Sequence, residues 1–202
     1  MKWKSKGGFG AVSGVAKSGT MSFHTQDAGR DKNESQQSQL FMKKGFVIPA
    51  NAGQVRLSFF HIFNFEPGYD GGVLEISADD GDYQDAGSLI LVGGYDGKVT
   101  QKSNNPLGSR FAWTARGRPG VFSQVVVDLS DFAGKRVRLR FLAGFDDATG
   151  IAEGYTGWFI DDIRVTAVMY SCGQAQSSGQ TILTDVAGRN PVKVTRIRQR
   201  IE

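Results

Sequence analysis

Residues 157–165 read Gly157-Trp158-Phe159-Ile160-Asp161-Asp162-Ile163-Arg164-Val165, a run of aromatic and branched residues with two adjacent carboxylates in its middle. This composition predicts a β-strand, in which successive side chains point to opposite faces. Asp161 is therefore expected on the same face as Phe159, Ile163 and Val165, which have the character of core residues. A carboxylate on such a face must be paired, hydrogen-bonded, protonated or bound to a metal ion, because burying a bare charge is too costly.

Other segments show the same alternation. Residues 54–66 carry apolar and aromatic side chains on both faces, which indicates a central strand covered on both sides. Residues 135–142 alternate arginines with Val137, Leu139 and Phe141, so the arginines are expected to point outward. The chain contains 27 Gly and 14 Phe, a composition typical of strands joined by tight turns. Many such segments, without long helical periodicity, predict an all-β, two-sheet antiparallel β-sandwich.

The run 157–165 also resembles the last strand of the jelly-roll domains appended to bacterial secreted metallopeptidases of the immune-inhibitor-A type, and it is similar to the end of MAM domains. Further pieces match in the same order over roughly residues 20–168, and they are Phe46–Ala50, Leu57–His61, Glu66–Ser77, Asn105–Leu107, Val127–Gly134 and Val137–Phe141. The resemblance implies a jelly-roll sandwich that serves as an accessory domain of a secreted or cell-surface protein. The His-Glu-x-x-His segment of a peptidase centre is absent from this sequence.

The sandwich is expected to span residues 15–170. Residues 1–14 are rich in Gly and Lys and are expected to form an irregular lead-in, without the apolar stretch of a signal peptide. Residues 171–202 are expected to form a polar linker and a basic tail. This tail could fray, add a strand to the sandwich or pair with a neighbouring chain, which would make an oligomer.

Charge is distributed unevenly along the chain, whose net charge is +4. No Lys or Arg lies between Arg56 and Lys98, although this stretch holds many acids, and the basic residues gather toward the two ends. A nucleic-acid-binding domain favours a basic stripe on its folded core, so nucleic acid is not expected as a partner. No apolar run approaches the ~20 residues of a membrane span, so membrane insertion is not expected either.

The acidic residues suggest a metal site. Calcium takes six to eight oxygen ligands from carboxylates, carbonyls and water. The jelly-roll topology could bring two loop–strand junctions together, and the resemblance implies a structural Ca²⁺ beside the Asp-Asp-Ile strand. The candidate ligands are Glu66, Asp70, Glu153, Asp161 and Asp162. In the alternative, Asp161 accepts backbone hydrogen bonds or pairs with Arg138 or Arg140, and the loop acids are solvated.

Aromatic side chains in loops could bind a ligand by stacking on the flat apolar faces of sugars. The candidates for such a surface are Tyr69, Tyr83, Tyr95, Trp113 and Tyr155. In the alternative, Trp113 and Trp158 pack in the core and the tyrosines cover loop backbone.

Catalytic residues cannot be assembled from the motifs. The two histidines, His24 and His61, do not form a zinc motif, and His61 lies between phenylalanines as a core-edge residue would. Cys172 is the single cysteine and lacks a nearby base in the sequence. The predicted function is that of a non-catalytic binding module for a glycan or protein surface. The alternative is a structural subunit of an extracellular assembly that uses the tail for subunit contacts.

Overall fold

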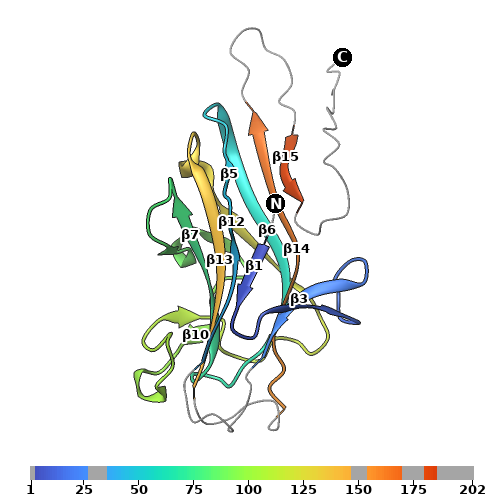
Figure 1. The fold of residues 1–202 in the computed structure, drawn as a ribbon, viewed down its shortest axis with the longest axis vertical. Coiled ribbons are helices and arrows are strands. Elements are labelled where there is room, and N and C mark those ends of the chain that lie inside the picture. The colour runs from blue at the N-terminus through green and yellow to red at the C-terminus, as the bar shows by residue number, and fades with distance from the viewer. Residues whose placement is uncertain (1–2, 27–35, 147–153, 170–179, 186–202) are drawn as a thin grey trace.

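The computed structural model describes residues 3–26, 36–146, 154–169 and 180–185, and these form two antiparallel sheets packed face to face (Figure 1). Sheet A has the order β1 (Trp3–Lys6), β4 (Gln36–Met42), β13 (Arg136–Phe145), β7 (Gly71–Ala78) and β8 (Gln84–Asp85), with β5 (Phe46–Val47) also paired to β13. Sheet B has the order β2 (Gly10–Ser13), β3 (Met21–Thr25), β14 (Gly157–Met169), β6 (Ala52–Asn64), β12 (Ser123–Asp128) and β9 (Ile90–Val92), with β15 (Gln180–Asp185) also paired to β14.

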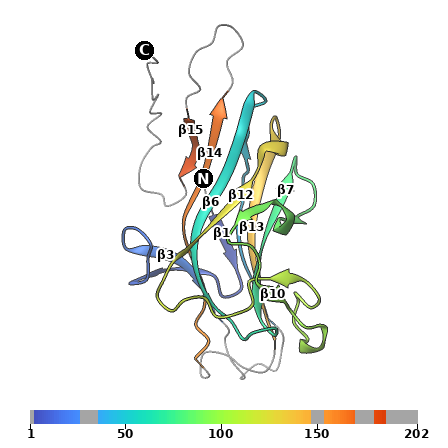
Figure 2. The same ribbon diagram turned by 180° about the vertical axis from the view of Figure 1, so that it is seen from behind.

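Short elements complete the fold. A separate strand pair joins β10 (Gly97–Lys98) to β11 (Phe111–Ala112), and in both views it lies below β7, on the side away from β14 (Figures 1 and 2). Three 3-10 turns, η2 (Gly87–Leu89), η3 (Gln101–Ser103) and η4 (Ser130–Phe132), are the helical elements of the described ranges. The described part of the chain has no helix of the length and hydropathy that a membrane crossing needs. The predicted two-sheet antiparallel sandwich of jelly-roll type is confirmed.

The core fills the space between the sheets with one face of each strand. From β6 come Leu57, Phe59 and His61, and from β13 come Leu139 and Phe141, all of them buried. Aromatic rings meet edge to face in this layer, with the centroids of Phe59 and Phe141 5.1 Å apart. The inward alternation predicted for residues 135–142 is confirmed. The opposite residues of β13, including Arg138 and Arg140, therefore face away from the core.

A β-bulge interrupts the alternation of side chains that was predicted for residues 157–165. The register of β14 against β6 shifts between Asp161 and Arg164, and Asp162 has a φ of 48°, in the left-handed region. Trp158 and Ile160 therefore point into the core before the bulge, and Ile163 does so after it. The prediction that Phe159 shares the core face was wrong, because the alternation was extended through the extra residue. Phe159 instead stacks on His24 outside the core, with ring centroids 3.9 Å apart.

Segments near both ends of the chain form strands of the two sheets. Residues 1–14 were expected to be irregular, yet β1 and β2 form there as edge strands of the two sheets. Trp3 packs between Phe23 and Phe141, and Phe9 is buried against Trp158, so apolar contacts hold this segment on the core. At the other end, β15 pairs with β14 of the same chain, as one of the open alternatives for the tail predicted. Residues 186–202 lie outside the described ranges.

Candidate functional site

The outer face of sheet A carries a row of side chains that runs across five strands. The register pairs Lys4 with Phe41, Phe41 with Arg140, Arg140 with Glu75, and Glu75 with Asp85. Because the alternate residues of these strands fill the core, the row faces away from it. We call it the transverse row. Lys4 is exposed and Phe41 is half-buried.

Glu75 is the anchor of the transverse row. Its carboxylate accepts hydrogen bonds from Arg110 Nη1 at 2.8 Å and from Arg140 Nε at 2.6 Å, and only 6% of its side chain is exposed. The guanidinium of Arg110 also donates to Asp85 Oδ2 at 2.6 Å. Burial lowers the pKa of Arg110, but the hydrogen bonds that it donates to Asp85 and Glu75 raise the pKa overall. The result is a fixed charge network, since both arginines are held by planar carboxylate contacts.

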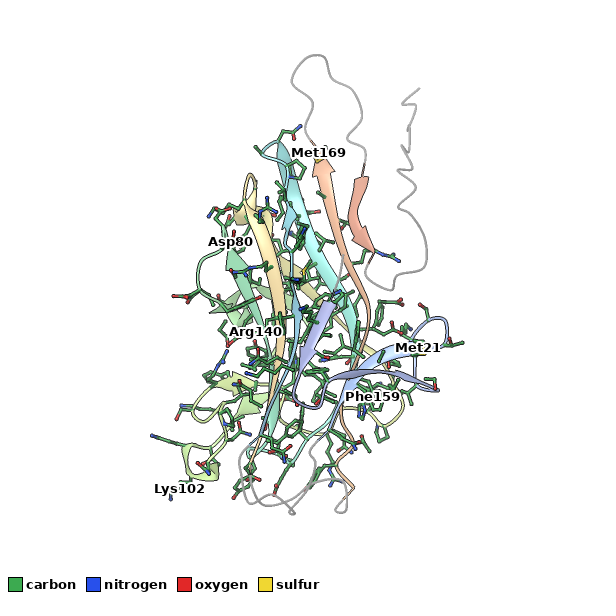
Figure 3. All side chains as sticks on the ribbon, viewed as in Figure 1. Met21, Asp80, Lys102, Arg140, Phe159 and Met169 are labelled. Carbon is green, nitrogen blue, oxygen red and sulfur yellow. The ribbon has the colours of Figure 1, made fainter. Side chains whose placement is uncertain are left out.

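Tyr83 covers the next part of this face. Its ring lies 4.1 Å from the guanidinium carbon of Arg140 and 5.5 Å from that of Arg138, so two cations stack on one aromatic ring. Burial raises the pKa of Tyr83, and the two neighbouring arginines counteract that shift. Arg138 donates to Ser77 Oγ at 3.1 Å, while its Nε lies 3.6 Å from Asp80 and has no hydrogen-bond partner. Figure 3 shows Asp80 and Arg140 on one side of the molecule and Phe159 on the other.

An open pocket of about 650 Å³ lies at the end of the transverse row, where β8 and β11 approach each other. The side chain of Phe111 is 65% exposed there. Asp85 and Arg110 line the pocket as an ion pair, and Ser88 and Ser109 add hydroxyl groups. The remaining lining residues are Gly87, Gly94 and Tyr95.

The structure holds this pocket in shape by local hydrogen bonds. Asp85 Oδ1 accepts from the backbone N–H of Gly87 at 2.7 Å and from the hydroxyl of Tyr95 at 3.1 Å. The Tyr95 hydroxyl also lies within hydrogen-bond distance of both backbone groups of Leu74 on β7. Burial and the charge of Asp85 raise the pKa of Tyr95, so this phenol stays protonated and donates. The carboxylate and ring that line the pocket are therefore positioned before any ligand arrives.

The five aromatic residues predicted for a ligand surface divide into three groups. The prediction was wrong for Trp113, which is 1% exposed and lies in the core. The alternative, in which Trp113 and Trp158 pack in the core, is confirmed. Tyr83 and Tyr95 do lie at the transverse row and the pocket. Tyr69 is exposed near Asn105, which donates to its backbone oxygen, and Tyr155 lies under the Arg116 guanidinium at 4.7 Å.

The acids predicted to bind calcium also divide. Asp161 Oδ2 accepts from the backbone N–H groups of Lys17 at 2.8 Å and Ser18 at 3.2 Å, and its Oδ1 accepts from that of Asp162 at 2.7 Å. Asp162 accepts from the hydroxyl of Ser18 at 2.6 Å. The first part of the alternative, backbone hydrogen bonds to Asp161, is thus present. Arg138 and Arg140 instead pair with acids on β7 and its turn.

Glu66 and Asp70 lie at the connection from β6 to β7. Asp70 is buried, and its Oδ1 accepts from the backbone N–H of Asp146, a second buried acid, at 2.8 Å. Glu153 lies outside the described residues. Within the described ranges no three His, Cys, Asp or Glu side chains gather as metal ligands would, so the four described candidates do not form one site. The calcium ion stays a prediction.

His61 and His24 have different environments. His61 is buried among Phe59, Phe63 and Trp113, and burial lowers its pKa to about 3. The pKa of His24 is also lowered by burial, although its contact with the Thr156 carbonyl opposes the shift. Cys172 lies outside the described residues.

The residues missed from the sequence are those of the transverse row and pocket, above all Phe41, Glu75, Arg110 and Phe111. The sequence indicated only the outward arginines of residues 135–142 and the aromatic residues Tyr83 and Tyr95. The rest come together through pairing between strands that are distant in the chain, such as β1 with β4 and β4 with β13.

No family model matches the sequence, and no curated protein matches it. Among solved structures, the carbohydrate-binding module TmCBM61, in complex with β-1,4-galactotriose, is 16% identical, with a TM-score of 0.47 over 81% of this chain and 86% of that chain. The carbohydrate-binding module TmCBM27, studied for mannan recognition, is 15% identical, with a TM-score of 0.35 over 81% of this chain and 86% of that chain.

The CBM22-1–GH10 modules of Clostridium thermocellum endo-1,4-β-D-xylanase 10B, complexed with xylohexaose, are 13% identical, with a TM-score of 0.44 over 86% of this chain. This chain spans only 27% of that structure. At these identities and TM-scores the similarity identifies no ligand for this chain. The resemblance to metallopeptidase accessory domains and MAM domains is matched by no family model and stays a prediction, although the jelly-roll fold that it implied is confirmed.

Proposed function

We propose that this chain is a non-catalytic glycan-binding module, and that the glycan lies in the pocket at Phe111 and along the transverse row. The observation that carries the proposal is the pocket of about 650 Å³, in which an exposed aromatic ring stands beside the fixed ion pair of Asp85 and Arg110. The ring offers an apolar surface to the C–H face of a sugar. The carboxylate of Asp85 and the guanidinium of Arg110 are planar and can bind neighbouring hydroxyls of a sugar. These contacts would fix the orientation of the sugar ring.

The polar groups of this site favour binding over catalysis. Asp85 and Glu75, the acids nearest the pocket, are both engaged in ion pairs with arginines. Glycoside hydrolysis needs a carboxylic acid that can protonate the leaving oxygen, together with a second carboxylate across the bond. Secretion and a cell-surface location are further parts of the proposal, which the sequence resemblance suggested.

The test is a binding screen of the full chain against soluble polysaccharides and oligosaccharides. Titration calorimetry then measures the affinity for each glycan that binds. Phe111→Ala should weaken binding at least tenfold, equivalent to about 1.4 kcal/mol, because it removes the exposed ring on which a sugar would stack. Met21→Ala is the matched control, since Met21 is 41% exposed on β3, on the other side of the molecule (Figure 3). Equal binding by wild type and Phe111→Ala would exclude the pocket as the glycan site.

The alternative of a structural subunit that assembles through its tail stays a prediction. Here β15 pairs with its own β14, over Arg164 to Val168. If the tail also joined neighbouring chains, removal of residues 171–202 would reduce the mass measured by light scattering to that of a monomer.

A further inference from the structure

The outer face of sheet A carries cations that a negatively charged ligand could reach. Arg110 and Arg140 lie over the buried carboxylate of Glu75, and their own side chains are 29% and 24% exposed. The carboxylate is thus covered by the cations that it binds, and the cations face outward. Asp85 and Asp80 are acids near the same face, and at 39% and 73% they are more exposed than these two arginines.

Two lysines extend this positive surface beyond the arginines. Lys4 and Lys6 are exposed on β1, and Trp3 of the same strand packs on the core, so the lysines share the outer face with the transverse row. Lys4 is in register with Phe41 and, through it, with Arg140; Lys6 is in register with Gln39. Among the residues that the structure describes, neither lysine is paired with an acid, in contrast to Arg110 and Arg140.

The spacing of these cations suits a ligand with repeated negative groups. Lys4 and Arg140 lie on strands that are two positions apart, and neighbouring strands are about 4.8 Å apart, so their backbones are separated by roughly 10 Å. A ligand with several negative groups along its length can contact both sites at once. A chain that crosses the strands would meet Lys4, Arg140 and then the pocket at Arg110 in succession.

The ligand must also tolerate exposed carboxylates on the same face. Asp85 lines the pocket, where it would repel a phosphate backbone that carries one charge per nucleotide. A sugar hydroxyl can instead donate to Asp85, while acidic groups elsewhere on the same chain meet the cations. We therefore propose, resting on the glycan-binding function above, that the glycan is an acidic polysaccharide whose carboxylates or sulfates contact Arg140, Lys4 and Lys6.

The experiment measures affinity for three groups of polysaccharide by affinity electrophoresis and calorimetry. Polygalacturonate and alginate carry carboxylates, heparin carries sulfates as well, and galactan, xylan and mannan are neutral. Methyl-esterified polygalacturonate tests the charge on an unchanged backbone. The proposal predicts that acidic chains bind at least tenfold more tightly than neutral ones, that esterification removes this advantage, and that added salt weakens binding. The carboxylate and sulfate arms identify the anionic group.

The double variant Lys4→Gln/Lys6→Gln should weaken binding of the acidic chain about fivefold or more. Both side chains are exposed, so the fold should survive, which a thermal melt would verify. Lys17→Gln is the control, because Lys17 Nζ lies over the ring of Phe60 on the outer face of sheet B. The hydrogen bond from Lys17 to Asp161 comes from the backbone N–H and is kept in this variant.

Each outcome separates the two proposals. Binding to neutral glycans alone would keep the glycan-binding function and overturn the acidic ligand. Binding to no glycan at all would overturn both. Equal binding to a single-stranded oligonucleotide and to the acidic glycan would replace glycan recognition by general attraction to polyanions, and it would count against the role given to Asp85.

Discussion

The indole Nε1 of Trp158 on β14 donates a hydrogen bond of 3.2 Å to Nδ1 of His61 on β6, in the middle of the core. The bond requires a neutral imidazole, because only an unprotonated Nδ1 can accept. It joins the two central strands of sheet B at the place where the aromatic side chains of both sheets meet. Burial keeps His61 in this neutral form by lowering its pKa to about 3.

The first prediction is that the free energy of unfolding decreases as the pH is lowered below about 6.5, because His61 is buried in its neutral form. In the unfolded chain this histidine has a pKa near 6.5, so between pH 6.5 and about 3 unfolding takes up a proton. The contribution is fully present above pH 6.5 and decreases by about 1.4 kcal/mol per pH unit as pH falls toward 3. Urea unfolding at a series of pH values should give a smaller slope for His61→Phe than for wild type.

His61→Phe should also be less stable at pH 7, by roughly 1–3 kcal/mol, because it leaves the Trp158 N–H without an acceptor. The slope rather than the absolute stability is therefore the diagnostic quantity. His24→Gln serves as the control and should keep most of the wild-type slope. Identical slopes in wild type and His61→Phe would show that His61 does not titrate between the two states as described.

The second prediction concerns the bulge of β14. Asp161→Ala removes the acceptor of three backbone N–H groups, those of Lys17, Ser18 and Asp162, and should lower the free energy of unfolding by roughly 3 kcal/mol. Asp161→Asn keeps the shape and one carbonyl oxygen and should lose less. Chemical denaturation measures both variants. A loss below about 0.5 kcal/mol in Asp161→Ala would mean that water replaces the carboxylate at no cost.

The left-handed backbone of Asp162 gives a separate test of the same bulge. With a φ of 48°, this position is compatible with Gly and costly for a β-branched residue. Asp162→Val should therefore be less stable than Asp162→Gly by about 1–2 kcal/mol, although both lose the bond to Ser18. If the two variants unfold at the same urea concentration, the bulge does not require this conformation.

The third prediction is that Gly72 cannot accept a side chain. A Cβ at this position of β7 would lie 2.6 Å from ring atoms of Trp158, which is fully buried and cannot move away. Gly72→Ala should cost about 1–3 kcal/mol, as overpacking of a core does, and should perturb the tryptophan fluorescence. Gly10→Ala is the control, since a Cβ there meets no atom within 4 Å. Equal stability of the two variants would contradict the close packing of the sheets at Trp158.

The sequence predicted some strand faces correctly, but it did not predict the bulge or the pocket. The faces of β6 and β13 followed from alternation, because each strand is regular over its inward positions. The faces of β14 did not, since one left-handed residue at Asp162 reverses the alternation and no local pattern marks it. The pocket depends on Arg110, which reaches Glu75 and Asp85 from a different segment of the chain. Such a contact depends on the register of distant strands, which a single sequence does not fix.

The fourth prediction addresses calcium, for which two places remain among the predicted ligands. At the bulge, Asp161 already accepts three backbone hydrogen bonds, and an ion would have to displace some of them. At the connection from β6 to β7, Asp70 and Asp146 are both buried, and Glu66 belongs to the same turn through the bond from Asp70 N to its backbone oxygen. Three acidic side chains do not gather there within the described ranges, so an ion at this second place, where we expect it, would take its remaining ligands from backbone carbonyls and water.

A thermal melt in excess calcium and in EDTA measures the effect. An ion that binds only the folded chain, at about 100 times its Kd, adds roughly 2.7 kcal/mol and raises Tm by several degrees. Asp70→Asn should abolish this rise, whereas Asp161→Asn should lower Tm equally with and without calcium. The reverse pattern would move the ion to the bulge. The absence of a rise in wild type, together with metal analysis that finds no bound calcium, would show that the prediction of a structural ion was wrong.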